Sequence, residues 1–162
     1  MRFIGSKEDK DLYLNLIKEH LPSNIEDLDY VEPFGGSFGL AKTLDVKPKR
    51  LIYNDLILYD VDICIADEIH HLDYNEILNM YDNENTIFYL DPPYYGKEHI
   101  YGMERKFNIF HEELRNNVKN RKGTILISYE KCSFISKLYN GETIYLYNGK
   151  NHYKEKEMLI KI

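Results

Sequence analysis

Short apolar runs alternate with helix-like patterns along this chain, and that alternation constrains the fold more than any other feature. Six runs rich in β-branched and aromatic residues are typical of strands: 30–32, 51–53, 86–90, 124–128, 143–147 and 158–162. Apolar residues at helical spacing lie between them, at 12–21, 40–44, 77–81 and 109–118. This alternation predicts an α/β fold, a mostly parallel sheet with helices on both faces.

The end of the chain departs from this pattern. Only residues 149–153 connect the last two strands, which is too short for a crossover helix, so the sequence predicts an antiparallel hairpin there. In sheets of this class ligands bind beyond the carboxyl ends of the strands, at the topological switch point. Functional residues are therefore expected just after Glu32, Tyr53 and Leu90.

Length and composition indicate a single domain over residues 1–162. Of the 162 residues 43% are hydrophobic, which supports a buried core. No apolar run approaches the ~20 residues needed to span a bilayer, and the charged start lacks the apolar stretch of a secretory signal. Cys64 and Cys132 stand alone, which argues against a disulfide framework or a zinc site. We expect a cytoplasmic protein with no membrane partner and no metal.

Charge is distributed unevenly along the chain. The net charge is −6, which by itself argues against a nucleic-acid partner. Residues 1–90 carry 8 Lys/Arg and 18 Asp/Glu, whereas residues 91–162 carry 13 and 9, so the halves have net charges of −10 and +4. Two explanations fit this asymmetry: chance in a chain with 30% charged residues, or a polarised molecule whose second half faces a polyanion. Composition does not decide between them.

The first motif follows the first predicted strand. It reads Glu32-Pro33-Phe34-Gly35-Gly36-Ser37-Phe38-Gly39. Glycines at a strand-to-helix turn let the backbone bend sharply and approach a ligand, although GG-x-x-G is not the dinucleotide spacing and also suits a purely structural turn. About 20 residues on, Asp55 ends the second strand where a ribose diol would be held. Together the two features favour a nucleoside-bearing cofactor.

The second motif follows the run 86–90 and reads Asp91-Pro92-Pro93-Tyr94. Consecutive prolines remove two backbone donors, fix φ and push Asp91 into an extended conformation, which makes a stiff platform. Asp91 and the Pro92 carbonyl offer two acceptors for the N–H groups of an exocyclic amine, a poor nucleophile because its lone pair is delocalised into the ring. Tyr94 offers a face on which a base can stack. The motif thus predicts nucleophile activation by positioning.

Taken in order, these motifs resemble those of the Dam-type, amino-group-specific adenine DNA methyltransferases, which use S-adenosylmethionine (SAM). The resemblance extends over nearly all of the chain. The segments that carry it are Phe3-Ile4-Gly5-Ser6-Lys7, Val31-Glu32-Pro33-Phe34-Gly35-Gly36-Ser37, Tyr53-Asn54-Asp55, Leu72-Asp73-Tyr74, Asp91-Pro92-Pro93-Tyr94, Ile125-Leu126-Ile127-Ser128-Tyr129 and Glu157-Met158-Leu159-Ile160.

The resemblance implies a Rossmann-like SAM methyltransferase sheet of about seven strands, the last antiparallel. It implies an adenine flipped out of DNA into the pocket and methylated at N6. The implied catalytic residues are Asp91, Pro92, Pro93 and Tyr94. The implied SAM-binding residues are Lys7, Glu32, Pro33, Phe34, Gly35, Gly36, Ser37, Asp55, Asp73, Tyr74 and Asp91.

One departure from the family pattern concerns target recognition. Family members that read a sequence insert several dozen residues between the ribose acid and the catalytic motif. Here residues 56–72 separate Asp55 from Asp73, and residues 74–90 separate Asp73 from Asp91. We expect these two short spans to contain the helix, strand and helix that the core itself requires. The sequence therefore predicts no separate target-recognition domain, and a partner chain is one way to supply recognition.

The remaining DNA-contact candidate is the partly basic segment 95–108, which equally suits a surface loop. Two other readings of the whole chain stay open: the same chemistry on RNA, and a non-catalytic SAM-binding subunit of a larger assembly.

Overall fold

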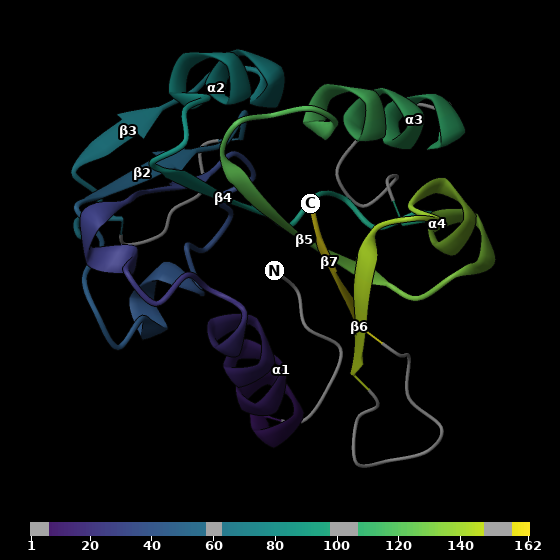
Figure 1. Cartoon of the computed structure of the whole chain (residues 1–162), viewed down its shortest axis with the longest axis horizontal. Coiled ribbons are helices and arrows are strands. Elements are labelled where there is room, and N and C mark those ends of the chain that lie inside the picture. The colour runs from purple at the N-terminus through teal and green to yellow at the C-terminus, as the bar shows by residue number, and fades with distance from the viewer. Residues whose placement is uncertain (1–6, 58–62, 98–106, 148–156) are drawn as a thin grey trace.

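Seven strands make up one sheet in the computed structural model of the chain (Figure 1). The structure describes residues 7–57, 63–97, 107–147 and 157–162, without the side chains of 7–11 and 107. The strands are β1 (Asp29–Glu32), β2 (Arg50–Asn54), β3 (Glu68–His70), β4 (Thr86–Leu90), β5 (Thr124–Glu130), β6 (Thr143–Tyr147) and β7 (Glu157–Lys161). Their order is β3-β2-β1-β4-β5-β7-β6. Only β7 is antiparallel to its neighbours, β5 and β6, which confirms the predicted hairpin.

The switch point lies between β1 and β4. Strand β1 pairs in parallel with β2 on one side, Asp29 opposite Arg50, and with β4 on the other, Asp29 opposite Thr86. The connections that leave β1 and β4 therefore diverge, and a crevice opens at their carboxyl ends. This is the location that the sequence indicates for the chemistry.

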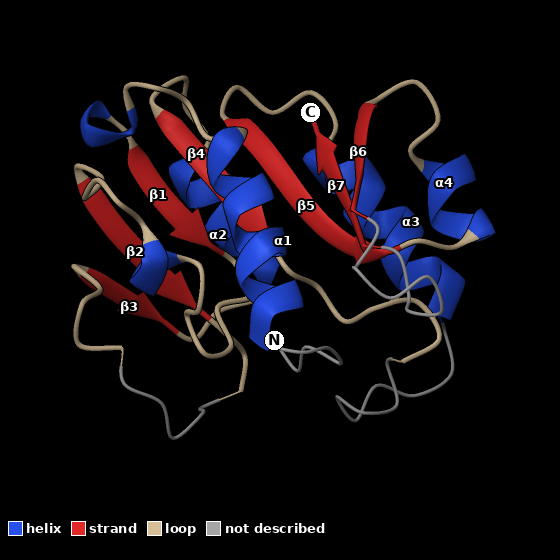
Figure 2. Cartoon of the chain, turned by 90° about the horizontal axis from the view of Figure 1, so that it is seen from below, coloured by secondary structure: helices blue, strands red, loops and turns tan. Residues whose placement is uncertain are grey.

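Helices cover both faces of the sheet (Figure 2). They are α1 (Lys7–Glu19), α2 (Tyr74–Tyr81), α3 (Phe107–Val118) and α4 (Ser133–Leu138), with short 3₁₀ turns η1 (Ile25–Asp27) and η2 (Ala41–Thr43). Helix α1 lies on one face and the other three α-helices lie on the opposite face. The sheet thus separates two buried clusters, one centred on Tyr13 and Ile17 of α1, the other on Ile77 of α2 and Leu114 of α3.

Burial on both faces explains why the central strands are continuous apolar runs. In β4, Ile87 and Tyr89 belong to the α1 cluster, whereas Phe88 and Leu90 belong to the cluster beneath α2 and α3. All five residues of this strand are buried. A parallel sheet covered by helices on both sides requires this pattern.

The predicted helix at 40–44 is wrong, because the structure has only the single 3₁₀ turn η2 there. Gly36 and Phe38 have φ of +47° and +54°, which an α-helix cannot include, so no helix begins before Leu40. Pro48 limits how far a helix could extend towards the C-terminus, since the residue before a proline avoids helical backbone. One turn is all that fits between them.

The span after β2 also differs from expectation. Strand β3 and helix α2 are present, but in the described parts of 56–67 the chain makes turns and bends, and 58–62 lie outside the described residues. Neither β3 nor α4 was predicted individually from the residues. They contain three and six residues, too few for a period to emerge.

None of the helices that the structure describes is long and apolar enough to cross a membrane.

Candidate functional site

The turn after β1 is held together by its own chain. Glu32 is buried, and one carboxylate oxygen accepts hydrogen bonds from the Tyr30 hydroxyl at 2.9 Å and from the Ala41 amide at 3.2 Å. Burial raises the pKa of Glu32 to about 8, against the lowering effect of those two bonds. Glu32 therefore fixes the start of η2 to the end of β1.

Glycine is required at position 35 by close packing. The Gly35 amide donates to the Asn54 carbonyl at 2.7 Å, so this turn lies directly against the end of β2. A Cβ at Gly35 would lie 2.3 Å from Cε2 of Tyr53, far inside contact distance. The turn glycine thus brings β1 and β2 together at the switch-point edge.

Asp55 has its place beside this turn. Its Oδ2 accepts the amide of Gly36 at 2.9 Å, and its Oδ1 accepts the amide of Ile57 at 2.9 Å. Each carboxylate oxygen retains a second lone pair for a ligand. Asp55 therefore shapes the turn and remains half-buried next to it.

Asn54 is a buried residue that the sequence reasoning missed as a site residue. Its amide nitrogen donates to the carbonyls of Pro33 and Leu72, both at 2.9 Å, and its oxygen accepts the Leu72 amide at 2.9 Å. One side chain at the end of β2 therefore ties together the loops that follow β1 and β3. A polar residue at the end of an apolar strand was the signal that could have identified it.

Asp73 and Tyr74 begin helix α2. Asp73 caps the helix by accepting the Asn75 amide at 2.9 Å. The Tyr74 ring stacks on Phe34, with ring centroids 5.1 Å apart, and Phe110 of α3 packs edge-on against both. These rings join the Gly-rich turn to the two helices behind the sheet.

Asp91 follows β4 directly, and Tyr94 lies three residues beyond it. The Tyr94 hydroxyl donates to Oε2 of Glu157 at 3.1 Å, and Lys97 forms an ion pair with Glu130. Burial raises the pKa of Asp91 to about 6 and that of Glu157 to about 8. The carboxyl groups after β4 and at the start of β7 therefore both have a pKa raised by burial.

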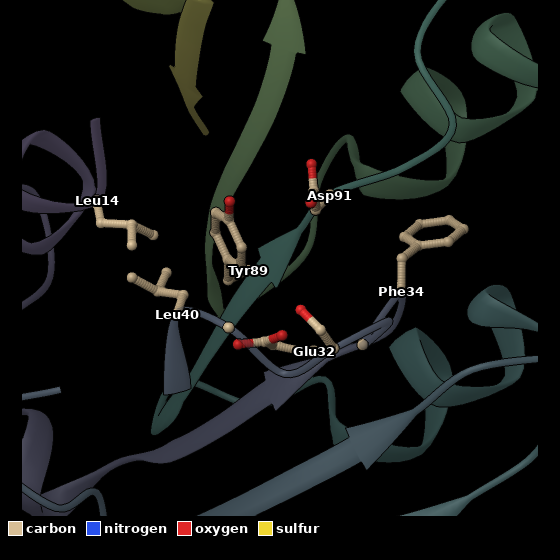
Figure 3. Close-up of a pocket in the computed structure, with 9 residues that line it drawn as sticks. Leu14, Glu32, Phe34, Leu40, Tyr89 and Asp91 are labelled. Atoms are coloured by element: carbon tan, nitrogen blue, oxygen red, sulfur yellow. The ribbon is translucent and has the colours of Figure 1, made fainter. Parts of the chain in front are cut away.

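A cavity of about 330 Å³, measured to include its open side, lies between these strand ends (Figure 3). Its lining residues are Leu14, Glu32, Phe34, Gly35, Ser37, Gly39, Leu40, Tyr89 and Asp91. Apolar walls with a few polar groups among them are typical of small-molecule sites. The structure thus brings part of the Gly-rich motif and Asp91 to one cavity.

A family model for the D12 class N6 adenine-specific DNA methyltransferases matches residues 58–154, more than half of the chain. The chain belongs to this family. The matched region contains Asp73, Tyr74 and the 91–94 motif, whereas the Gly-rich turn and Asp55 lie before it. No curated protein sequence matches the chain significantly.

Solved methyltransferase structures share the fold. N-methyltransferase NodS from Bradyrhizobium japonicum WM9 is 11% identical with a TM-score of 0.60, and 96% of each chain is covered. An rRNA methylase from Streptococcus thermophilus is 13% identical with a TM-score of 0.56, covering 97% of this chain and 96% of that one. SMU.776, described as a methyltransferase complexed with SAH, is 12% identical with a TM-score of 0.55, and the match covers 95% of this chain and 49% of that one. The D12 chain therefore has the class I SAM-methyltransferase fold.

Not every residue expected at the site of this D12 methyltransferase lines the cavity. The residues that do not line it are Pro33, Gly36, Asp55 and Asp73, which lie in the turns around it, and Tyr74, the first residue of α2. Pro92, Pro93 and Tyr94 continue from Asp91. The backbone of Lys7 begins α1, but its side chain lies outside the described residues, as do 3–6.

Leu14, Leu40 and Tyr89 also line the cavity, although the sequence reasoning did not name them as site residues. Alternation along β4 was a usable signal for Tyr89, since it shares a face with Asp91 two residues on. Leu14 reaches the cavity only because α1 packs against this face, which no local pattern shows.

The suggested DNA-contact segment is only partly described, because 98–106 lie outside the described residues. Tyr95 stacks on Phe134, with centroids 4.5 Å apart, and its hydroxyl donates to Asn108 at 3.0 Å. Near the basic end of α3, Arg115 forms an ion pair with Glu142 at 2.5 Å, so its charge is paired within the protein. Within the described ranges no group of three or more His, Cys, Asp or Glu side chains could hold a metal ion.

Proposed function

We propose that this chain transfers a methyl group from SAM to the exocyclic N6 amino group of adenine in DNA. The observation that carries the proposal is the meeting of the Gly-rich turn and Asp91 in one cavity at the switch point. Membership of the D12 family supports adenine in DNA as the substrate.

The residues present fit a nucleoside-bearing cofactor with a charged tail. Gly35 brings backbone to the cavity wall, Phe34 and Leu40 supply apolar walls, and Asp55 lies beside the turn with lone pairs to spare. The proposed SAM-binding set is Lys7, Glu32, Pro33, Phe34, Gly35, Gly36, Ser37, Asp55, Asp73, Tyr74 and Asp91. When bound, SAM supplies an electrophilic methyl group on a sulfonium.

The protein acts on the target amine by positioning it. Ionised Asp91 and the Pro92 carbonyl accept its two N–H groups, which turns the nitrogen lone pair out of conjugation and towards the methyl group. Pro93 keeps this backbone rigid, and Tyr94 offers its ring to the base. The burial that raises the pKa of Asp91 also strengthens these hydrogen bonds, because less water competes for the carboxylate.

We further propose that residues 1–162 act as one catalytic domain without a separate target-recognition domain. A partner chain then supplies sequence recognition, or the preference for sequence is relaxed. With a net charge of −6, binding to DNA should be weak and should fall steeply with salt.

The test is methyl transfer from labelled SAM to duplex DNA, single-stranded DNA and RNA of the same sequence, with the methylated base identified by mass spectrometry. We expect N6-methyladenine in DNA. Transfer of the labelled methyl group to RNA and not to DNA would identify RNA as the substrate. SAM binding without transfer to any of the three would favour a non-catalytic subunit and contradict the proposal.

A further inference from the structure

Three hydrogen-bonded hydroxyl groups lead from α1 to the wall of the cavity. The Tyr13 hydroxyl of α1 donates to Oγ of Ser128 in β5 at 3.0 Å. Oγ of Ser128 lies 2.8 Å from the hydroxyl of Tyr89 in β4, and all three residues are buried. Tyr89 lines the cavity, whereas Tyr13 and Ser128 do not. The two other hydroxyls therefore lie behind Tyr89 as seen from the cavity.

The direction of these hydrogen bonds follows from counting protons. The geometry makes Tyr13 the donor to Ser128, and the Met158 carbonyl at 3.2 Å is a second acceptor for the same proton. Ser128 has one proton of its own, and within the described ranges the acceptor left for it is the Tyr89 oxygen. A buried donor without an acceptor costs free energy, so we expect Ser128 to donate to Tyr89.

Tyr89 then has its own proton to give. Burial, and next the charge of Asp91, raise the pKa of Tyr89 well above its ordinary value, so the hydroxyl stays protonated at neutral pH. Among the described residues Ser128 is the hydrogen-bond partner of this hydroxyl. A hydroxyl that accepts a proton from Ser128 behind it can donate to a molecule in the cavity. Tyr89 is therefore a donor in the cavity wall.

The neighbouring Asp91 indicates which chemical group suits this donor. The Tyr89 and Asp91 side chains extend from β4 to the same side (Figure 3), and residues two apart on a strand are separated by roughly 7 Å. One wall thus offers a donor at Tyr89 and an acceptor at Asp91. An amino acid group, which carries an ammonium and a carboxylate on one carbon, can bridge the two with a hydrogen bond at each end. SAM has such a group.

The other carboxyl group of the cavity does not oppose a bound carboxylate. Burial raises the pKa of Glu32 to about 8, so this side chain is mostly protonated at neutral pH. Asp91 is then the negatively charged residue of the lining. Its carboxylate has about four lone-pair sites, so it can accept the ammonium of the cofactor as well as the target amine.

We propose that Tyr89 is a cofactor-contact residue whose hydroxyl donates to the carboxylate of the amino acid group of SAM. Ser128 is a positioning residue that orients this hydroxyl. The contact favours cofactors that carry a carboxylate, so Tyr89 contributes to ligand specificity. This inference rests on the proposed function and adds a residue outside the proposed SAM-binding set.

The test uses binding and needs no turnover. Calorimetry measures the affinity for S-adenosylhomocysteine (SAH), for decarboxylated SAH and for deaminated SAH. Tyr89→Phe removes the hydroxyl and keeps the ring, and Ser128→Ala leaves Tyr89 intact but removes the group that orients it. Tyr81→Phe is the matched control, because it also removes a bonded tyrosine hydroxyl, 2.6 Å from Glu68 of β3. Thermal unfolding confirms that each variant is folded.

The expected pattern separates the ligands by their carboxylate. In Tyr89→Phe the affinity for SAH and for deaminated SAH should fall about tenfold, because a hydrogen bond to a charged group is lost. The affinity for decarboxylated SAH should stay within about twofold of the wild type. Ser128→Ala should show the same pattern with a fall of about threefold, and Tyr81→Phe should leave all three affinities within about twofold.

Two results would overturn the proposal. One is an equal loss of affinity for SAH and for decarboxylated SAH. The other is a loss for both of these ligands with deaminated SAH unaffected, which would make Tyr89 an acceptor for the ammonium. A wild type that binds none of the three ligands would refute the proposed function together with this inference. Binding of SAH without the expected pattern would refute this inference alone.

Discussion

Two carboxyl groups flank the switch point, the buried Glu32 and the half-buried Asp91, and their surroundings differ. Glu32 at the end of β1 also lines the cavity, but its carboxyl group is bonded to Tyr30 and to the backbone of η2. Asp91 at the end of β4 lines the cavity (Figure 3), and no side chain or backbone amide of the described residues is bonded to it as Tyr30 and Ala41 are to Glu32. Burial raises the pKa of both, to about 8 and about 6.

The difference shows that a raised pKa alone does not identify a reactive group. Glu32 uses its acceptor capacity to keep the turn in shape, so removing it should change stability and cofactor binding. Asp91 keeps acceptor capacity at a cavity wall, so removing it should change turnover. Variants at the two strand ends should separate these roles.

The largest effect is expected from Asp91→Ala. Removing the acceptor for the target amine should lower kcat by roughly 10²–10³-fold, while SAM affinity, measured by calorimetry, changes by less than about threefold. Asp27→Ala, which removes an exposed carboxylate in η1, is the matched control. A comparable loss of SAM affinity and turnover would make the cofactor contact the main role of Asp91 and erase the distinction from Glu32.

Gly35→Ala tests how tightly the β1 end is built. The new Cβ would lie 2.3 Å and 2.5 Å from two Tyr53 ring atoms and 3.0 Å from the Asn54 carbonyl. We expect a loss of roughly 2–3 kcal/mol in the free energy of unfolding, measured by urea denaturation. Gly39→Ala, where the new Cβ would lie 3.3 Å from the Ser37 hydroxyl oxygen at the end of a short side chain, should cost under about 1 kcal/mol. Equal losses in the free energy of unfolding for the two variants would show that the backbone around Gly35 can move to accept a Cβ.

Glu32→Gln tests the structural carboxyl through pH. The folded chain holds a proton on Glu32 up to about pH 8, whereas an unfolded glutamate releases it near 4.5, so stability falls as pH rises between these values. Between pH 6 and 8 the loss should be roughly 1–2 kcal/mol more in wild type than in Glu32→Gln, measured by denaturation at each pH. Parallel curves for the two proteins would contradict the assignment.

Asp55→Ala should give the smallest change. Unlike Asp91→Ala, it should affect SAM affinity more than kcat. Loss of the acceptor for the Gly36 amide, and of the proposed ribose contact, should weaken SAM binding about tenfold. At saturating SAM, kcat should stay within about threefold. Asp45→Ala, an exposed carboxylate on the loop before β2, is the control. A fall in kcat without a fall in affinity would place Asp55 with the substrate.

Most of the scaffold could be predicted from local pattern. Six of the seven strands and the hairpin follow from apolar runs and connection length, because strands buried on both faces need continuous apolar sequence. The exceptions have local causes: β3 and α4 are too short to show a period, and positive φ at Gly36 and Phe38 prevents the helix expected at 40–44.

The sequence by itself determined which groups end the strands: the Gly-rich turn, Asp55 and the 91–94 motif all follow apolar runs at the expected edge. Only the tertiary structure decided which atoms meet there. Asn54 joins the loops after β1 and β3, Leu14 reaches the cavity from α1, and the antiparallel register of β7 carries Glu157 to Tyr94. Such contacts depend on strand order and helix packing over distances along the chain that no local pattern encodes.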